Sequence, residues 1–189
     1  MQICLVDCGS RKVPQIRQIL KAAGCQVVTV KLELANQFQF EHSSGVVISG
    51  GDRLFTGVHC DQTLGELFAF VDTLTLPTLG ICLGHQAIAL RHGAVPYLGP
   101  ERRTQETIHL LSEHALFRNI QSPSLFRTDH CEGVPLPLGF CRLATSEAYT
   151  VEAMACLTKP LFGVQFHPEV SGLPGEILLC NFCDMVQCL

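Results

Sequence analysis

The sequence predicts an α/β fold in which residues 1–189 form one domain with a doubly wound, mostly parallel central sheet flanked by helices. The first half of the chain alternates short apolar runs with helix-like segments, an order typical of parallel sheets. Glycine-containing polar segments follow two of these runs, at the carboxyl ends of strands where doubly wound sheets place their sites. At 189 residues and 47% hydrophobic composition, the chain is long enough to bury a substantial core.

The elements expected in the first half follow from turn residues and apolar runs. The first helix has Ser10 as its expected N-cap, Pro14 in its first turns and Gly24 at its end. Gly93 is the expected stop of a later helix. The predicted strands are 3–6, 26–30, 45–48 and 78–81, and the predicted helices are 10–23, 63–74 and 86–92.

The second half is expected to form a series of strands and then one helix. No internal repeat, low-complexity tract or linker is visible in it. The predicted strands are 104–111, 124–128, 139–144, 151–156 and 161–166, and the predicted helix is 175–186.

The charge pattern excludes several functional classes. The formal net charge is -4, the basic residues are scattered, and Arg102-Arg103 is the one adjacent arginine pair, so we expect no nucleic-acid partner. No apolar run approaches the ~20 residues of a membrane span. Residues 1–7 resemble a first strand rather than a signal peptide. We therefore expect a soluble protein that binds neither nucleic acid nor membrane.

The eleven cysteines are odd in number and irregular in spacing, and a domain of this size does not need disulfides. We therefore expect a reducing, cytoplasmic setting. Cys180 and Cys183 form a single C-x-x-C pair within the predicted last helix, without a second pair to complete a zinc site. Core-facing thiols are favoured there, and no metal is expected.

A candidate nucleophile lies where the predicted strand 78–81 meets the following helix. Gly80-Ile81-Cys82-Leu83-Gly84 matches the G-x-nucleophile-x-G pattern of a strand-to-helix elbow. The glycines are expected because side chains there would collide with the neighbouring strand or the helix start. Amides at a helix N-terminus favour a thiolate. The alternative, a buried core cysteine beside a helix, stays open on this segment alone.

A candidate base lies at the end of the predicted strand 161–166. His167 leaves this strand into a turn that Pro168 stiffens, and Glu169 is placed to accept the proton on the far ring nitrogen. Nucleophile, base and orienting carboxylate form the arrangement found in nucleophilic hydrolases. By itself, His-Pro-Glu is compatible with a surface turn.

A third motif completes a family pattern. The apolar run Val46-Val47-Ile48 leads into Ser49-Gly50-Gly51, whose N–H groups could face a developing oxyanion, although an ordinary strand-to-loop turn is the alternative. Together, segments 46–51, 80–86 and 163–170 resemble the class I (triad) glutamine amidotransferases, in family order and over essentially the whole chain. The resemblance implies that family's fold, with a flavodoxin-like core.

The resemblance also implies an activity. The chain would hydrolyse the side-chain amide of L-glutamine through a cysteine thioester, giving glutamate and ammonia. The roles that the resemblance implies are Cys82 as nucleophile, His167 as base and then acid, Glu169 as orienter, the N–H groups of Gly51 and Leu83 as oxyanion hole, and Gln86 in glutamine recognition.

Within the family, the chain is similar to the separate glutaminase subunit of archaeal-type GMP synthase. The similarity rests on segments 129–134, 136–140, 144–147 and 151–154, and on Val170. It implies that backbone groups of Asp129 and His130 hold the α-substituents of glutamine, whereas a loop capping the strand 124–128 is the alternative. It also implies ammonia delivery to a separate ATP-dependent synthetase that aminates XMP. ATP and magnesium would belong to that partner, and this chain would need no cofactor.

Some positions depart from the family pattern. Asp52 replaces the proline that usually follows the oxyanion glycines, and Glu132 replaces the aspartate of the Ser-His-x-Asp segment. Departures of this kind fall in loops that would shape the oxyanion hole or border a synthetase.

Three other functions stay open on the sequence. One is a stand-alone γ-glutamyl hydrolase or peptidase. Another is the glutaminase subunit of a different synthetase, because segment 83–88 also resembles anthranilate and aminodeoxychorismate synthase subunits. The third is a catalytically silent scaffold subunit on the same fold.

Overall fold

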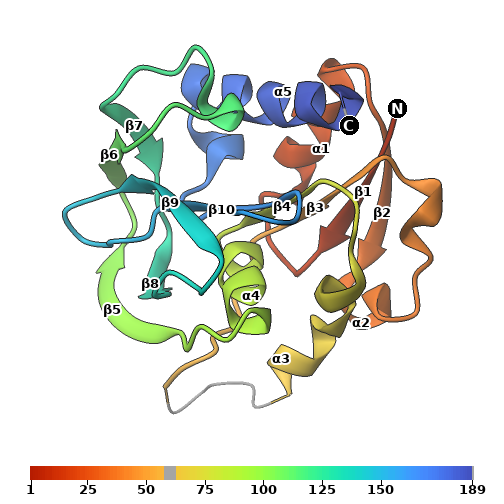
Figure 1. Cartoon of the computed structure of the whole chain (residues 1–189), viewed down its shortest axis with the longest axis horizontal. Coiled ribbons are helices and arrows are strands. Elements are labelled where there is room, and N and C mark those ends of the chain that lie inside the picture. The colour runs from red at the N-terminus through yellow and green to blue at the C-terminus, as the bar shows by residue number, and fades with distance from the viewer. Residues whose placement is uncertain (58–62, 189) are drawn as a thin grey trace.

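The computed structural model describes residues 1–57 and 63–188, and in this part of the chain a nine-stranded sheet runs through the molecule (Figure 1). Half of the sheet is parallel, in the spatial order β2 (Gln26–Lys31), β1 (Gln2–Asp7), β3 (Gly45–Ile48), β4 (Thr78–Ile81) and β11 (Leu161–Val164). The sheet continues from β11 through antiparallel strands in the order β10 (Ala153–Cys156), β9 (Phe140–Thr145), β6 (Gln105–Leu110) and β7 (Ser124–Arg127).

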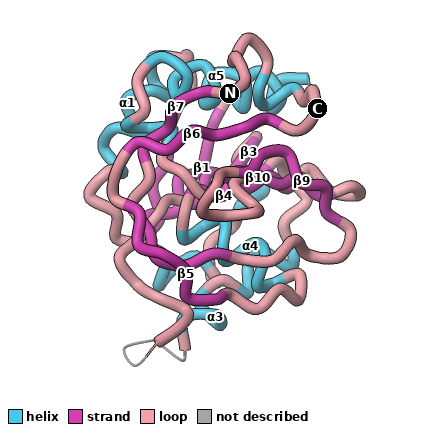
Figure 2. Tube along the Cα trace, turned by 90° about the vertical axis from the view of Figure 1, so that its left-hand side faces the viewer, coloured by secondary structure: helices cyan, strands magenta, loops and turns pink. Residues whose placement is uncertain are grey.

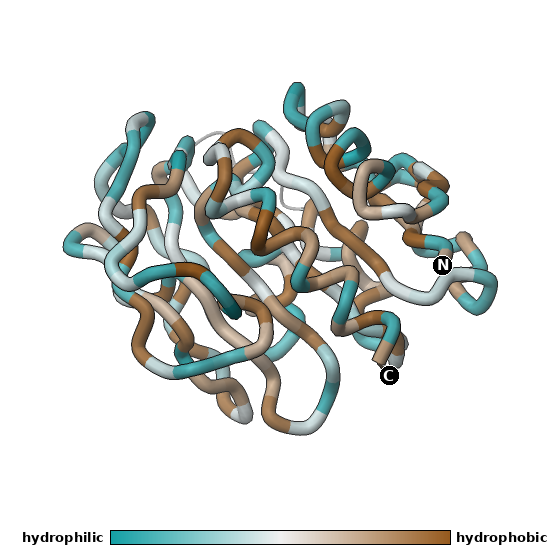
Figure 3. Tube along the Cα trace, turned by 90° about the horizontal axis from the view of Figure 1, so that it is seen from above, coloured by the Kyte–Doolittle hydropathy of each residue, from teal (hydrophilic) through white to brown (hydrophobic). Residues whose placement is uncertain are grey.

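The inner parallel strands are buried on both faces, which explains their continuous apolar sequences. Side chains of β1 alternate between two hydrophobic cores: Ile3 and Leu5 enter one, and Cys4 and Val6 enter the other. In Figure 3, hydrophobic segments (brown) run through the interior, while hydrophilic residues (teal) gather in outer loops. The sheet therefore separates two layers of helices.

Figures 1 and 2 show these helical layers on opposite sides of the sheet. One layer holds α1 (Val13–Ala22) and α5 (Leu173–Cys188), which pack on the Ile3 side. The other holds α2 (Leu32–Ala35), α3 (Leu64–Leu67) and α4 (Leu83–Arg91), on the Cys4 side.

The predicted α/β fold with a doubly wound core is confirmed, and its parallel half is the part built from alternating strands and helices. In the second half, successive strands follow without crossover helices and therefore pair antiparallel. Two further strands, β5 (Tyr97–Arg102) and β8 (His130–Gly133), form a small antiparallel sheet that the sequence did not predict. Most of β5 is exposed, so it carries no apolar alternation.

Ser10 is not the N-cap of the first helix. The helix α1 begins at Val13 with Lys12 at the cap, and the Ser10 hydroxyl instead accepts a hydrogen bond from the Lys12 N–H (3.1 Å). Pro14 explains the later start, because proline fits the first helical turn, where N–H groups have no helical partner. Gly24, the predicted stop, has φ +82°.

The segment 63–74 is not one helix. It divides into α3 and a 3-10 turn, Ala69–Thr73. The side chain of Asn36 donates to the Glu66 carbonyl (2.8 Å) and accepts from the Phe70 N–H (2.9 Å). These two groups would otherwise bond to each other in a continuous α-helix, so the inserted amide interrupts it.

Candidate active site

Cys82 lies in the turn between β4 and α4, with φ +51° and ψ -105°. A positive φ is costly for a residue with a side chain and persists only where neighbours fix the backbone. A Cβ on Gly80 would lie 2.4 Å from the Gly84 carbonyl oxygen, and a Cβ on Gly84 would lie 2.5 Å from the Ile48 carbonyl oxygen. The predicted elbow is therefore present, and its two glycines allow the start of α4 to pack directly on the strands.

His167 reaches Cys82 because β11 lies beside β4 and parallel to it. The backbone N–H of His167 donates to the carbonyl of Arg127 at the end of β7 (2.8 Å), which fixes the turn. Nδ1 of His167 lies 2.8 Å from Oε1 of Glu169, and both side chains are buried. Cys82, His167 and Glu169 are thus brought together from the ends of adjacent strands.

The electrostatics of the imidazole favour its charged form. Burial lowers the pKa of His167, but charge attraction and a hydrogen bond with Cys82, together with Glu169, outweigh burial and raise this pKa to about 10. Gly50 packs against the same pair, since a Cβ there would lie 3.0 Å from Cε1 of His167 and 3.4 Å from Cβ of Cys82. Three loops therefore converge on a protonated imidazole beside the sulfur of Cys82.

Gly51 packs against Leu83, the residue that follows Cys82 in the elbow. A Cβ on Gly51 would meet the Cys8 carbonyl oxygen at 2.4 Å and a Leu83 methyl at 2.8 Å. Ser49 fixes the conformation of this loop, because its hydroxyl accepts a hydrogen bond from the Cys8 N–H and donates one to the Gly50 carbonyl, each at 2.9 Å. Within the described residues, neither the Gly51 N–H nor the Leu83 N–H donates to an acceptor. Both backbone donors are therefore available beside Cys82.

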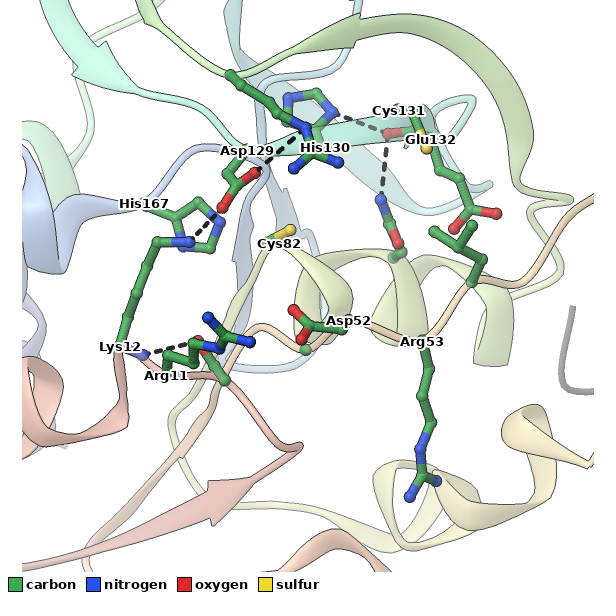
Figure 4. A pocket seen from close by; sticks show the side chains of 15 residues that line it. Arg11, Lys12, Asp52, Arg53, Cys82, Asp129, His130, Cys131, Glu132 and His167 are labelled. Atoms are coloured by element: carbon green, nitrogen blue, oxygen red, sulfur yellow. Dashed lines mark hydrogen bonds and ion pairs between the residues drawn. The ribbon is translucent and has the colours of Figure 1, made fainter. Parts of the chain in front are cut away.

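A cavity of about 560 Å³ opens next to Cys82 (Figure 4). Its lining includes all three residues that the sequence predicts to bind substrate: Gln86, Asp129 and His130. The cavity is large enough for an amino acid side chain and lies beyond the carboxyl ends of the parallel strands, as expected for this class of sheet.

Gln86 projects from the first turns of α4 and is buried. Its Nε2 donates to the Glu132 carbonyl (3.1 Å) and to Oε1 of Gln165 (3.2 Å). Nε2 of Gln165 in turn lies 3.7 Å from Sγ of Cys82. A chain of side-chain amides thus connects Gln86 to the thiol.

Asp129 and His130 differ in their environments. Asp129 lies at the mouth of the cavity, where Nζ of Lys12 reaches its carboxylate across the opening (2.6 Å; Figure 4). The hydrogen bond from Lys12 is the main reason why the pKa of Asp129 is lowered. His130 is buried against Tyr149, and burial lowers its pKa to about 4. At neutral pH His130 is therefore an uncharged ring.

The sequence did not assign several residues that shape this site. Gln165 is fully buried beside the thiol, and its one signal was a polar residue inside an apolar strand pattern. Ser171 donates to the His167 carbonyl (2.6 Å) and accepts from the Arg127 N–H (2.9 Å), contacts that no sequence motif indicated. Gly50 belonged to the glycine motif without a stated role.

The C-x-x-C pair lies outside this site, on α5. Cys183 is buried, with its Sγ 3.5 Å from Sγ of Cys25, whereas Cys180 is exposed, so the prediction of core-facing thiols holds for one of the two. In residues 1–57 and 63–188, no cluster of three His, Cys, Asp or Glu side chains is arranged to hold a metal ion. No helix in this part of the chain has the length and apolar character needed to cross a bilayer.

The chain matches the model of a known family. The family model for glutamine amidotransferase class-I matches residues 4–185, so the chain belongs to the class-I glutamine amidotransferases. The predicted family is therefore confirmed, as is the prediction of an enzyme.

Two relatives of known name are similar to this chain over most of its length. The glutamine-hydrolyzing GMP synthase subunit from Methanosarcina barkeri is 38% identical over 150 residues, covering 78% of this chain and 76% of the relative. The protein of the same name from Methanocaldococcus jannaschii is 35% identical over 189 residues, covering 97% and 96%.

Solved structures show the same fold. A structure from Thermoplasma acidophilum aligns with a TM-score of 0.90 at 24% identity, covering 100% of this chain and 94% of the other. A glutamine amidotransferase from Thermotoga maritima aligns with a TM-score of 0.79 at 21% identity, covering 100% and 84%.

Proposed function

We propose that residues 1–189 form one glutaminase domain that hydrolyses the side-chain amide of L-glutamine and supplies ammonia to a separate ATP-dependent synthetase of the GMP synthase type. The observation that carries the proposal is the convergence of Cys82 with the His167–Glu169 pair beside two backbone N–H groups without acceptors. The relatives named as GMP synthase subunits support XMP as the molecule that the partner aminates.

In the proposed mechanism, the sulfur of Cys82 attacks the amide carbon of glutamine, and the N–H groups of Gly51 and Leu83 stabilise the oxyanion. The carbonyl then re-forms, and the C–N bond breaks. His167 donates its proton to the leaving nitrogen, which departs as ammonia and leaves a thioester. His167 next accepts a proton from water, which attacks the thioester and releases glutamate. Glu169 orients the ring throughout by holding Nδ1.

We assign glutamine recognition to Gln86, Asp129 and His130. Because Nε2 of Gln86 already donates to Glu132 and Gln165, the Oε1 atom of Gln86 is the group that accepts from the substrate amide. Backbone groups of Asp129 and His130, which also line the cavity, hold the α-substituents.

The cavity chemistry needs no cofactor in this chain, and ATP and magnesium belong to the partner. We propose a cytoplasmic location. The described cysteines are free thiols, and even Cys25 and Cys183 are unbonded at 3.5 Å, a state that a reducing compartment maintains.

The test measures glutamate release by the purified chain alone, with an XMP-aminating ATP pyrophosphatase, and with that pyrophosphatase plus ATP and XMP. A rate that rises with the partner, and GMP formation from glutamine, support the proposal. Turnover of γ-glutamyl peptides without any partner effect would indicate a stand-alone hydrolase. Absence of turnover and of thioester under all conditions would indicate a silent scaffold.

A further inference from the structure

We infer that Glu132 is a positioning residue, which holds the segment after the oxyanion glycines in place and thereby fixes the Gly51 N–H for catalysis. We call residues 52–57 the Asp52 loop. The inference rests on the proposed function, since it assigns a role in the same reaction to a residue outside the triad.

The side chain of Glu132 is the anchor of the Asp52 loop. It is 1% exposed, and its carboxylate accepts hydrogen bonds from the Phe55 N–H (3.1 Å), the Thr56 N–H (2.6 Å) and the Thr56 hydroxyl (2.6 Å). A buried carboxylate without such donors would be strongly unfavourable. The carboxylate and the loop therefore hold each other in one arrangement.

The backbone of the same residue faces the substrate-binding side chains. The Glu132 carbonyl accepts from Nε2 of Gln86 (3.1 Å) and contacts Nδ1 of His130 (3.0 Å). One residue of β8 is thus connected to the Asp52 loop through its side chain, and to Gln86 and His130 through its carbonyl. Figure 4 shows Glu132 on the cavity wall beside His130 and Cys131.

The backbone is fixed on both sides of Gly51. Ser49 secures the backbone before Gly51, through Cys8 and Gly50, and Glu132 secures the backbone after it. Asp52 itself lines the cavity. Since proline, which would restrict the backbone by its ring, is absent from position 52, the hydrogen bonds that the loop donates to Glu132 restrain the backbone on this side, together with the Arg53–Glu33 ion pair.

The decisive variant is Glu132→Gln, which keeps the shape but turns amide hydrogens toward the N–H donors of the loop. We expect kcat for glutamine hydrolysis to fall about 10- to 100-fold, when the enzyme concentration is taken as the concentration of Cys82 that can be alkylated. A fall of this size is expected when a catalytic group is misplaced by about 1 Å. We expect kcat/KM to fall in parallel, because the oxyanion exists only in the transition state. Alkylation of Cys82 by iodoacetamide displaces iodide without an oxyanion, and its rate should stay within about twofold.

Glu152→Gln is the matched control. Glu152 is also 1% exposed, but it bonds to Ser146 and lies outside the cavity lining. It should retain wild-type kcat. Thr56→Val removes one of the hydrogen-bond donors to Glu132 and should lower kcat less, about 3- to 10-fold. This variant tests the inference if Glu132→Gln does not fold. In a double-mutant cycle, the effects of Glu132→Gln and Thr56→Val should not add.

Hydrogen exchange at the Phe55 and Thr56 amides tests the anchor without any reaction, and it should accelerate in Glu132→Gln. The inference is overturned if this exchange is unchanged, if kcat stays within twofold of wild type, or if the iodoacetamide rate falls together with kcat. A wild-type chain that never hydrolyses glutamine, with or without a synthetase, contradicts the proposed function instead, and the exchange measurement still decides whether Glu132 holds the loop.

Discussion

Nδ1 of His167 lies 2.8 Å from Oε1 of Glu169, two residues further along the same turn, and the imidazole also forms a hydrogen bond with Cys82. The contact is local in sequence, but the contact with the thiol joins residues 85 positions apart. The contact with Glu169 holds the proton on Nδ1, so the opposite ring nitrogen is the one that exchanges its proton with the reacting groups.

The two buried partners of Cys82 should differ in their effect on rate. We expect His167→Ala to lower kcat for glutamine hydrolysis about 10⁴-fold and Glu169→Gln about 10²-fold, because proton transfer contributes more than orientation of the ring. Steady-state kinetics with a glutamate readout, with Cys82→Ala as the inactive control, measures both. Equal or greater damage at Glu169 contradicts the assigned roles.

The pKa of His167 should depend on the neighbouring sulfur. It is raised from 6.5 to about 10, so the stabilisation it represents is complete below pH 6.5 and is lost as the pH rises through 10. Cys82→Ala removes the main raising interaction and leaves the burial that lowers this pKa. The midpoint followed by NMR of the ring protons should therefore move down in the variant. An unchanged midpoint would show that the sulfur is not the cause.

Glu152 should make the fold sensitive to pH. Burial is the main reason why its pKa rises from 4.5 to about 7. The folded state therefore favours the protonated carboxyl, and this contribution is present below pH 4.5 and is lost as the pH rises through 7. It amounts to roughly 3 kcal/mol at most.

Glu152→Gln replaces the carboxyl with a group that does not titrate. Urea unfolding at several pH values should show a flatter profile between pH 5 and 8 than the wild type, and higher stability than the wild type at pH 8. Parallel profiles of the two proteins would exclude a titration of Glu152 in this range.

Adding a single Cβ atom to an elbow glycine should destabilise the fold. Gly84→Ala places a Cβ 2.5 Å from the backbone of Ile48, where no flexible atom can move away, so we expect a loss of about 3 kcal/mol of unfolding free energy together with activity. Gly65→Ala is the control, because the nearest atom to its added Cβ is a Leu90 methyl at 3.3 Å. Denaturant unfolding of both variants checks the contrast; similar losses would show that the collision at the elbow is absorbed.

The difference between the predicted and observed elements has a consistent cause. Strands β3 and β4 were predicted with their observed bounds because both are short apolar runs that end in glycine-containing turns. The break in 63–74 was not predictable, because it depends on the side chain of Asn36, about 30 residues earlier. The pairing of β5 with β8 likewise depends on partners far apart in the chain.

The sequence by itself determined the elbow around Cys82, the His167–Glu169 turn and the glycines at Gly50 and Gly51, because each is a local motif whose residues lie within a few positions of one another. The tertiary structure decided how these motifs are placed relative to one another. Only the pairing of β11 with β4 places the imidazole at the sulfur, and only the fold brings Glu132 to the loop after Gly51. Contacts of this kind depend on the order of the strands in the sheet and on side chains that contact residues far away in the sequence. Local sequence patterns specify neither the strand order nor these contacts.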